Sequence, residues 1–526
     1  MRAVQRGAPS PLATLGLIAA LIAILPLAGV VAVSASGATA DIAGPDLVRY
    51  ALTSAALAGL VAVVTGFAGT LAAWLVVMYR FPGHGILAWA LALPFAMPAF
   101  AMAYAYADLF DVAGDLRIWM RATAGFDLAI DLRSLPGAAF VLSCAFYPYV
   151  YLAMRAAFVT LPREAFESAR LLGCTDRQAL MRVAVPMARP ALAAGIALAV
   201  METLADYGAV QFLDVQTLTT GVVRAWFVYG SLASAALFAL PLLGVAALLL
   251  WIERRSRRGR SYNDGRGRGA SLPVTRLTGA RAVAATVYCL MLVGLGLLLP
   301  TGWLVWTSLD VVPDWPRLAA AARNSLGLAV AGAVVTVILA SSLALSGQRF
   351  PIATRVASLG YATPGAVMAI GLLIPAGWLW SVVPGGSANV AAGLLLLIYA
   401  YAARLMAAAL EPVEAGLARV TPSMTQAART LGADAMAAAL RVQLPVAAPA
   451  LFTAGLIVLI DILKELPATL ILRPFNFDTL AVISDNYARD ERLASAGWPA
   501  LLLIALALPG VMWLSRRIAP TRPEAS

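Results

Sequence analysis

The sequence predicts an all-α polytopic membrane protein, and three observations support this fold class. Of its 526 residues, 61% are hydrophobic and 12% are charged, whereas an ordinary soluble domain carries about 25% charged residues. Its apolar runs have the length of bilayer-spanning helices, about 20 residues each. A polar stretch in the first half also returns in the second half with the same spacing. We therefore expect about 12 transmembrane helices, arranged as two parallel six-helix repeats.

Apolar runs of bilayer length define the expected spans. In the first repeat, residues 1–252, they lie at 12–33, 51–79, 86–106, 137–158, 190–210 and 232–252. In the second repeat, residues 283–526, they lie at 283–306, 325–346, 356–380, 388–410, 450–472 and 498–515. Residues 253–282 are rich in arginine and glycine and have no apolar period, which indicates a flexible cytoplasmic linker beside anionic lipid headgroups.

The first apolar run has two interpretations. Its position and the "ATA" at residues 38–40 are also typical of a cleavable signal peptide. The run from Leu12 to Val33 is longer than the usual signal core of about 7 to 15 residues. We therefore favour a retained first span, with the cleaved signal as the alternative.

Arginine placement predicts the orientation. Arginines near residues 2–6, Arg80, the linker and Arg516 all fall on one side of the expected spans, and the positive-inside rule makes that side cytoplasmic. Both termini are then cytoplasmic, in a multi-pass protein of the cell inner (plasma) membrane. The net charge of +11 follows from this rule, because the arginines flank apolar runs and form no aromatic-laced basic face for nucleic acid.

The residue inventory argues against catalysis by this chain. The three cysteines, Cys144, Cys174 and Cys289, lack metal-site spacing, and His84 is the one histidine. No Ser/His/Asp set is evident, so a membrane-embedded enzyme is disfavoured and no cofactor is expected. The one lysine, Lys464, lies in "DILKELP" and not in a glycine-rich phosphate loop. ATP hydrolysis by that route is therefore excluded for this chain.

The polar stretch "ESARLLGCTDRQALMRVAVPMARPAL" (167–192) has a near copy, "QAARTLGADAMAAALRVQLPVAAPAL" (426–451). Gly173 and Gly432 are 259 positions apart, as are Pro186 and Pro445, which indicates duplication of a whole domain. Because each half holds an even number of expected spans, both enter the membrane in the same orientation. Such parallel repeats are related by an axis along the membrane normal.

Each copy predicts a helix, a sharp turn and a second helix, here named the first hook (163–186) and the second hook (422–445). Gly173 suits the left-handed position past the first short helix. Thr175 and Gln178 form a capping box for the second short helix, and Asp434 takes the cap position in the other copy. The two prolines, which lack an amide proton, are expected to end the second helices.

A polar hook that occurs twice in one sequence is either a surface for a partner or an amphipathic loop packed on its own membrane domain. The pattern Glu167-Ser168-Ala169, Gly173, Val183 to Pro186 resembles the EAA loop of binding-protein-dependent ABC importer permeases, the coupling helix that docks on the ATP-hydrolysing subunit. The resemblance implies these ATPase-coupling residues: Glu167, Ala169, Gly173, Pro186, Gln426, Ala428, Gly432 and Pro445. Ser168 and Gln426 depart from the family pattern, and the missing acid at 426 puts equal contact by both hooks in doubt.

Residues 202–227 and 463–481 resemble the fused double-length permeases of ferric iron importers, as does the six-plus-six layout. The resemblance implies a type I ABC importer permease fold, a cytoplasmic ATP-binding subunit dimer and an extracytoplasmic iron-binding protein as partners. Permeases for thiamine, phosphonate or another small solute share this layout and stay open, because the binding protein usually selects the solute. An ion-coupled secondary transporter is the alternative from another class; it would not need two hooks.

Two pairs of acids fall within expected spans: Glu202 with Asp206, and Asp461 with Glu465, again 259 positions apart. The i, i+4 spacing places each pair on one helix face, and intramembrane acids usually face a bundle interior or a watery cavity. We hypothesise that these four, with Tyr207, line the outer mouth of the pathway, since oxygen ligands suit a hard cation. In the alternative interpretation, they pair with Lys464 or Arg473 and cap helix ends.

Overall fold

The computed structural model describes residues 11–35, 44–111, 114–125, 130–161, 164, 168–169, 171–257, 275–346, 360, 363–382 and 390–518. The fold class is confirmed: apart from one short strand pair, the elements in these ranges are helices. Strand β1 (Tyr79–Arg80) pairs in parallel with β2 (Thr275–Arg276), and the Leu277 amide donates to the Arg80 carbonyl at 2.9 Å. The last residues of the predicted linker are therefore held against the end of the second span.

The chain divides into two compact units whose segments alternate along the sequence. Unit 1 comprises Met1–Gly44, Gly221–Leu243 and Trp315–Val482, and unit 2 comprises Pro45–Thr220, Gly244–Asp314 and Ile483–Ser526. Each unit draws on both predicted repeats, so the units do not coincide with residues 1–252 and 283–526. The division of the sequence into two repeats stays a prediction about the sequence.

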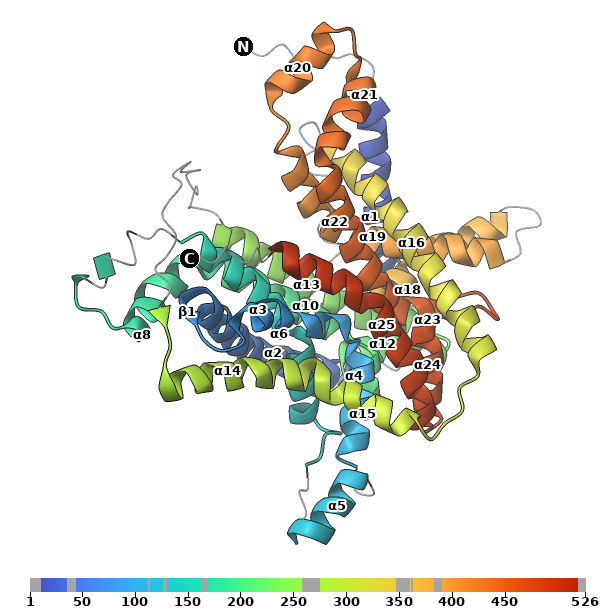
Figure 1. Cartoon of the computed structure of the whole chain (residues 1–526). Coiled ribbons are helices and arrows are strands. Elements are labelled where there is room, and N and C mark those ends of the chain that lie inside the picture. Colours follow the sequence, from blue (N-terminus) through green and yellow to red (C-terminus); the bar gives the residue numbers. More distant parts are fainter. Residues whose placement is uncertain are drawn as a thin grey trace. The chain divides into compact units, whose positions relative to one another are not determined.

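Unit 1 is a helix bundle that includes the first helix of the chain. Its helices are α1 (Pro11–Ala35), α16 (Trp315–Ser346), α18 (Gly365–Val382), α19 (Val390–Leu417), α20 (Pro422–Thr430), α21 (Ala435–Ala438), the π-helical turn η4 (Ala439–Gln443), α22 (Leu444–Lys464) and α23 (Pro467–Leu472). Helix α1 packs against α16, α18 and α19 (Figure 1).

The crossing of α1 and α18 needs two glycines. A Cβ atom on Gly29 would lie 2.3 Å from the Gly371 carbonyl oxygen, and one on Gly371 would lie 2.0 Å from the Pro26 carbonyl oxygen. Close helix approach through small residues is typical of membrane bundles. The Tyr399 hydroxyl also donates to the Ile22 carbonyl at 3.0 Å. The expected first span is thus built into the bundle; its retention in the mature protein stays a prediction.

Unit 2 holds most of the remaining helices. They are α2 (Gly44–Met78), α3 (His84–Ala90), the 3-10 turn η1 (Leu93–Ala96), α4 (Ala99–Leu109), α5 (Asp115–Ala124), α6 (Leu135–Val159), α8 (Asp176–Ala179), the π-helical turn η2 (Leu180–Ala184), α9 (Val185–Met187), α10 (Arg189–Ala205), α11 (Gly208–Phe212), α14 (Gly279–Val293), the π-helical turn η3 (Gly294–Leu298), α15 (Leu299–Ser308) and α25 (Leu493–Ile518). Three helices contribute to both units or to their boundary: α12 (Leu218–Phe227), α13 (Leu232–Arg257) and α24 (Leu480–Arg489).

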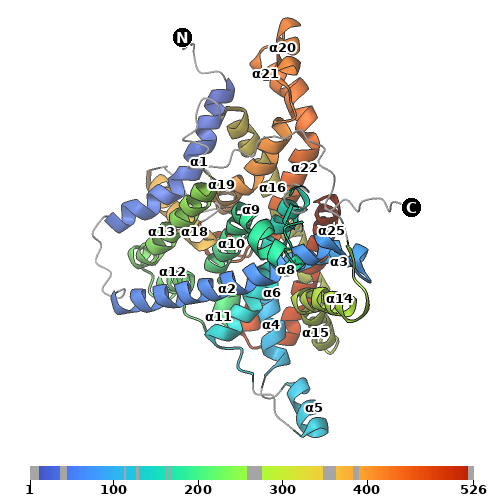
Figure 2. The ribbon, with the colours of Figure 1, turned by 90° about the vertical axis from the view of Figure 1, so that its left-hand side faces the viewer.

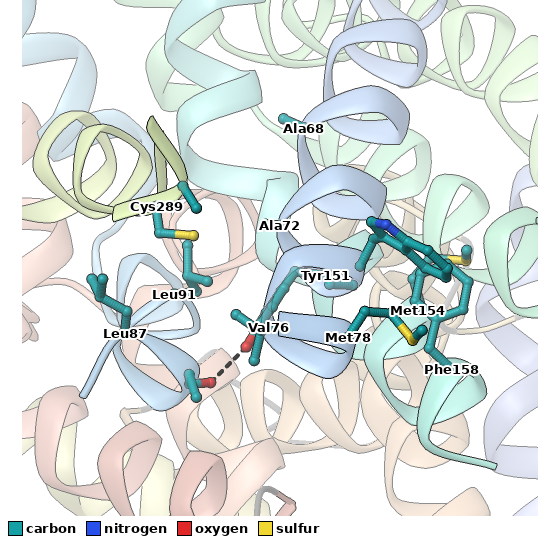
Figure 3. Close-up of a cluster of buried hydrophobic side chains, with 14 of the residues drawn as sticks. Ala68, Ala72, Val76, Met78, Leu87, Leu91, Tyr151, Met154, Phe158 and Cys289 are labelled. Carbon is teal, nitrogen blue, oxygen red and sulfur yellow. Dashed lines mark hydrogen bonds between the residues drawn. The ribbon is translucent and has the colours of Figure 1, made fainter. Parts of the chain in front are cut away.

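A buried cluster holds α2, α3, α6 and α14 together in unit 2 (Figure 3). Within it the Tyr151 hydroxyl donates to the Ala88 carbonyl at 2.5 Å. The one histidine lies at its edge: Arg80 Nη1 is 2.8 Å from His84 Nδ1, and His84 Nε2 is 2.8 Å from the Val76 carbonyl oxygen. Because the guanidinium only donates, Nδ1 accepts and Nε2–H donates, so His84 ties α3 to the end of α2.

Nine helices in the described ranges are long and apolar enough to cross a bilayer, and two bent pairs would raise the number to 11. The bent pairs are His84–Ala96 with Ala99–Leu109, at 93°, and Leu180–Met187 with Arg189–Ala205, at 70°. They correspond to the spans expected at 86–106 and 190–210. A shorter apolar helix, Gly365–Gly377, stands at the span expected at 356–380, so the count of 12 stays a prediction.

Candidate functional site

The turn inside each hook has the geometry that its glycine predicts. Gly173 has φ +81° and Gly432 has φ +88°, in the left-handed region. The Cys174 amide donates to the Ala169 carbonyl at 3.0 Å, and the Ala433 amide donates to the Ala428 carbonyl at 3.0 Å. These are the 6→1 bonds of a Schellman motif, so both first short helices end in the same way.

The predicted caps of the second short helices are also confirmed. The Thr175 amide donates to Gln178 Oε1 at 2.9 Å, and the Gln178 amide donates to Thr175 Oγ1 at 3.3 Å, which is a reciprocal capping box. In the second hook, Asp434 Oδ1 accepts from the Ala437 amide at 2.6 Å. These local hydrogen bonds thus fix where the second short helix of each hook begins.

The expectation that prolines end the second helices is wrong. Pro186 and Pro445 lie in the first turns of α9 and α22, and each follows a π-helical turn, η2 at Leu180–Ala184 and η4 at Ala439–Gln443. The wider π turn shifts the hydrogen-bond register, so the proline ring and its missing N–H are accommodated. Ala435–Lys464 is therefore one helix, while the first copy bends by 70° at Ala188.

The predicted coupling residues differ in exposure. Glu167 lies outside the described residues. Ala169 is buried, Pro186 and Ala428 are half-buried, and Gly173, Gln426, Gly432 and Pro445 are exposed. Ala169 is therefore packed against this chain and does not offer its side chain to a partner.

Sequence reasoning missed strongly exposed apolar side chains at matching positions of the two hooks. Leu172 is 86% exposed and Leu431 is 89% exposed, and each directly precedes the left-handed glycine. They occupy the same position in the two copies, 259 residues apart. An apolar residue repeated at the tip of a polar hook was the signal that would have identified them.

The acids of unit 2 lie where the span of α10 breaks. Helix α10 ends at Ala205, and Asp206 Oδ1 accepts from the Ala209 and Val210 amides at 2.9 and 3.2 Å. The carboxylate thus caps α11 as an N-cap side chain does. Glu202 is half-buried one turn earlier.

Tyr207 lies in a cluster with two residues from α24 and one from α4. Arg489 Nη2 donates to the Tyr207 hydroxyl at 2.5 Å, and Arg489 Nε donates to Asp485 Oδ2 at 2.7 Å. The Tyr104 hydroxyl donates to Asp485 Oδ1 at 3.1 Å. Tyr207 therefore joins the break after α10 to α24, and its hydroxyl is engaged by a cation.

The acids of unit 1 lie at the corresponding break between α22 and α23. Glu465 accepts from the Ala468 and Thr469 amides, both at 3.1 Å, and lies 3.2 Å from Arg404 Nη1 of α19. Its side chain is 1% exposed. Asp461 pairs with Lys464 at 3.5 Å.

Asp206 and Glu465, which are 259 positions apart, thus have the same structural role. Each caps the short helix that follows a broken span. Of the two cations expected to pair with the acids, Lys464 pairs with Asp461, whereas Arg473 pairs with Asp478. Within the described ranges, no group of three His, Cys, Asp or Glu side chains is arranged to hold a metal ion. These contacts favour the structural interpretation of the acids, and the pathway role stays a prediction.

Residues 65–260, from α2 to the linker, match the model of the family described as binding-protein-dependent transport system inner membrane component. The sulfate transport system permease protein CysT of Escherichia coli (strain K12) is 32% identical over 216 residues, which are 40% of this chain and 76% of that protein. The chain belongs to the binding-protein-dependent ABC transport permeases. Members of this family are membrane transport subunits and not enzymes.

Two further relatives differ in how much of this permease they cover. The Fe(3+)-transport system permease protein FbpB 2 of Haemophilus influenzae (strain ATCC 51907 / DSM 11121 / KW20 / Rd) is 24% identical over 453 residues, 83% of each chain. The sulfate transport system permease protein CysW of Escherichia coli (strain K12) is 29% identical over 175 residues, 33% of this chain and 58% of that protein.

The capping role of Asp206 gives a prediction that separates structure from pathway. Asp206→Asn keeps a side-chain acceptor for the Ala209 and Val210 amides and removes the charge, whereas Asp206→Ala removes both. If the permease needs only the cap, we expect near wild-type uptake for Asn, and for Ala a loss of about 1 kcal/mol of stability. Thermal unfolding in detergent and ATP-driven uptake measure the two effects. Uptake lost already in the Asn variant, at unchanged stability, would restore the pathway role.

Proposed function

We propose that the chain is the permease subunit of an ATP-driven importer of iron(III), in which it forms the translocation pathway and couples to a separate ATPase. The observation that carries the substrate is the match to the Fe(3+)-transport permease, which extends over 83% of both chains. A match of that extent includes both predicted repeats. The sulfate permease CysT corresponds to 40% of this chain.

Sulfate is the second candidate, because the identity with CysT, 32%, exceeds that with the iron permease, 24%. The two substrates differ in the groups that would bind them: a hard cation takes oxygen ligands, whereas an oxyanion takes amide and guanidinium donors. Half-buried Glu202 and Asp206 favour the first, and Arg489 beside Tyr207 favours the second. We place iron first on the extent of the match.

The two hooks are proposed to dock on a cytoplasmic ATP-binding subunit dimer, with an extracytoplasmic solute-binding protein on the other face. Exposed Leu172 and Leu431 support this proposal, because the core of a protein interface is more apolar than its rim, and these leucines stand at the tips of polar projections. With the hooks on the cytoplasmic side, both termini also lie on the cytoplasmic side of the inner membrane. For transport, each hook must bind one nucleotide state of the ATPase better than the other.

Reconstituted uptake tests the proposal. The purified permease, its ATPase and its solute-binding protein are placed in proteoliposomes, and accumulation of radiolabelled iron(III) and sulfate is measured with and without ATP. We expect ATP-dependent accumulation of iron and none of sulfate. Sulfate uptake without iron uptake would replace the substrate and keep the permease assignment. Uptake driven by an ion gradient, with no ATPase copurifying, would instead support the secondary transporter.

A further inference from the structure

Helix α5 (Asp115–Ala124) is a short helix in unit 2 that the transport mechanism does not use. Five residues separate it from the end of α4, and ten residues separate its end from the start of the spanning helix α6. In both views α5 stands apart from the other helices of unit 2, beyond α4 (Figures 1 and 2). Its C-cap, Gly125, has φ 70°, which closes the helix in the left-handed conformation.

Helix α5 exposes two large apolar side chains and buries one of its arginines. Ile118 is 52% exposed and Trp119 is 61% exposed, whereas Arg117 is 6% exposed. A second arginine, Arg121, donates from Nε to the Arg117 carbonyl at 3.3 Å. A helix that hides an arginine and presents a tryptophan and an isoleucine is suited to an apolar neighbour on the exposed side.

We propose that α5 lies in the membrane–water interface, with Ile118 and Trp119 inserted at the boundary of headgroups and acyl chains. The bilayer is within reach, because α5 is tethered by short segments to two membrane helices. Tryptophan prefers this depth, and an exposed arginine such as Arg121 complements lipid phosphates. The apolar contact is small, so the covalent tether supplies most of the localisation. The proposal is independent of the transported solute and of the face on which α5 lies.

Spin labels measure the depth of this face. Single cysteines replace Ile118, Trp119 and Arg121 in the full chain, in a background where Cys144, Cys174 and Cys289 are serine, and the labelled protein is reconstituted in phosphatidylethanolamine and phosphatidylglycerol vesicles. We expect labels at 118 and 119 to collide with dissolved oxygen several-fold more, relative to a water-soluble nickel chelate, than the label at 121. A label at Leu172→Cys, at the first hook tip, is the aqueous control.

Two results would overturn the proposal. Nickel-dominated collisions at 118 and 119, equal to those at 172, would place the face in water. The second result is labels that collide little with oxygen and freely with the nickel chelate, and that become protected only when the solute-binding protein is added. It would assign the face to that protein. Because both side chains are largely exposed, the cysteine variants are expected to reconstitute in wild-type amounts, and a normal yield validates each measurement.

Discussion

Replacing Leu172 and Leu431 together by glutamate is expected to abolish ATP-driven uptake while the permease still inserts and folds. Both side chains are more than 85% exposed on the hooks, so the change removes no internal packing. In an interface, each buried leucine contributes about 1.5 to 3 kcal/mol, and a carboxylate there adds a desolvation cost. The pair should therefore weaken ATPase binding by at least about 100-fold. Copurification of the ATPase and uptake in proteoliposomes measure it.

Val312→Glu is the matched control, because Val312 is 93% exposed and lies between α15 and α16 in the sequence, outside both hooks. This variant should bind the ATPase and transport as the wild type does. A double leucine variant that retains wild-type ATPase affinity would contradict docking through the hook tips. Single variants add a further reading: unequal losses would reveal that the two hooks contribute unequally, as the glutamine at 426 suggests.

Arg404→Leu is expected to cause the largest loss of stability among single changes in unit 1. It removes the guanidinium from Glu465, whose side chain is 1% exposed. Breaking one partner out of a buried ion pair costs about 3 to 5 kcal/mol, because the remaining charge has no counter-ion. We expect a lower midpoint of thermal unfolding and a lower yield in detergent extracts.

Two variants isolate the cause. Adding Glu465→Gln to Arg404→Leu removes the uncompensated charge and should recover part of the lost stability. Lys464→Met breaks the looser 3.5 Å pair with Asp461 and should have a smaller effect. A double variant less stable than Arg404→Leu alone would mean that the carboxylate acts mainly as the cap of α23, and the ion pair would then not be the source of the loss.

Local features of the hooks could be predicted from the sequence because they depend on neighbouring residues. The left-handed glycines and the caps at Thr175 and Asp434 need only a few adjacent side chains and amides. The common helix face expected for each pair of acids stays a prediction, because α10 ends at Ala205 and α22 ends at Lys464, directly before Asp206 and Glu465. By the same reasoning, the breaks after Ala205 and Lys464 are consistent with Gly208 and Pro467 that follow them.

Features that depend on distant partners could not be predicted. Arg404 reaches Glu465 across 61 positions, and Arg489 reaches Tyr207 across 282. No periodicity reports such contacts, so the sequence could group Tyr207 with the acids but could not show that Arg489 donates to its hydroxyl. The helix-ending role of the prolines failed for another reason: a π turn, which no residue pattern marks, absorbs the missing hydrogen bond.

The π-helical turn at the end of each hook has a mechanical consequence. The π turns η2 and η4 stand 259 positions apart, with prolines at matching places in both copies, yet the first copy bends by 70° and Ala435–Lys464 is one continuous helix. Related sequences thus take two shapes, so the shared prolines and the shared π turn do not by themselves fix the angle. Two ATPase subunits that dock on the hooks, as proposed, would therefore act through one bent helix and one continuous helix, and the same movement of the two subunits would be transmitted differently.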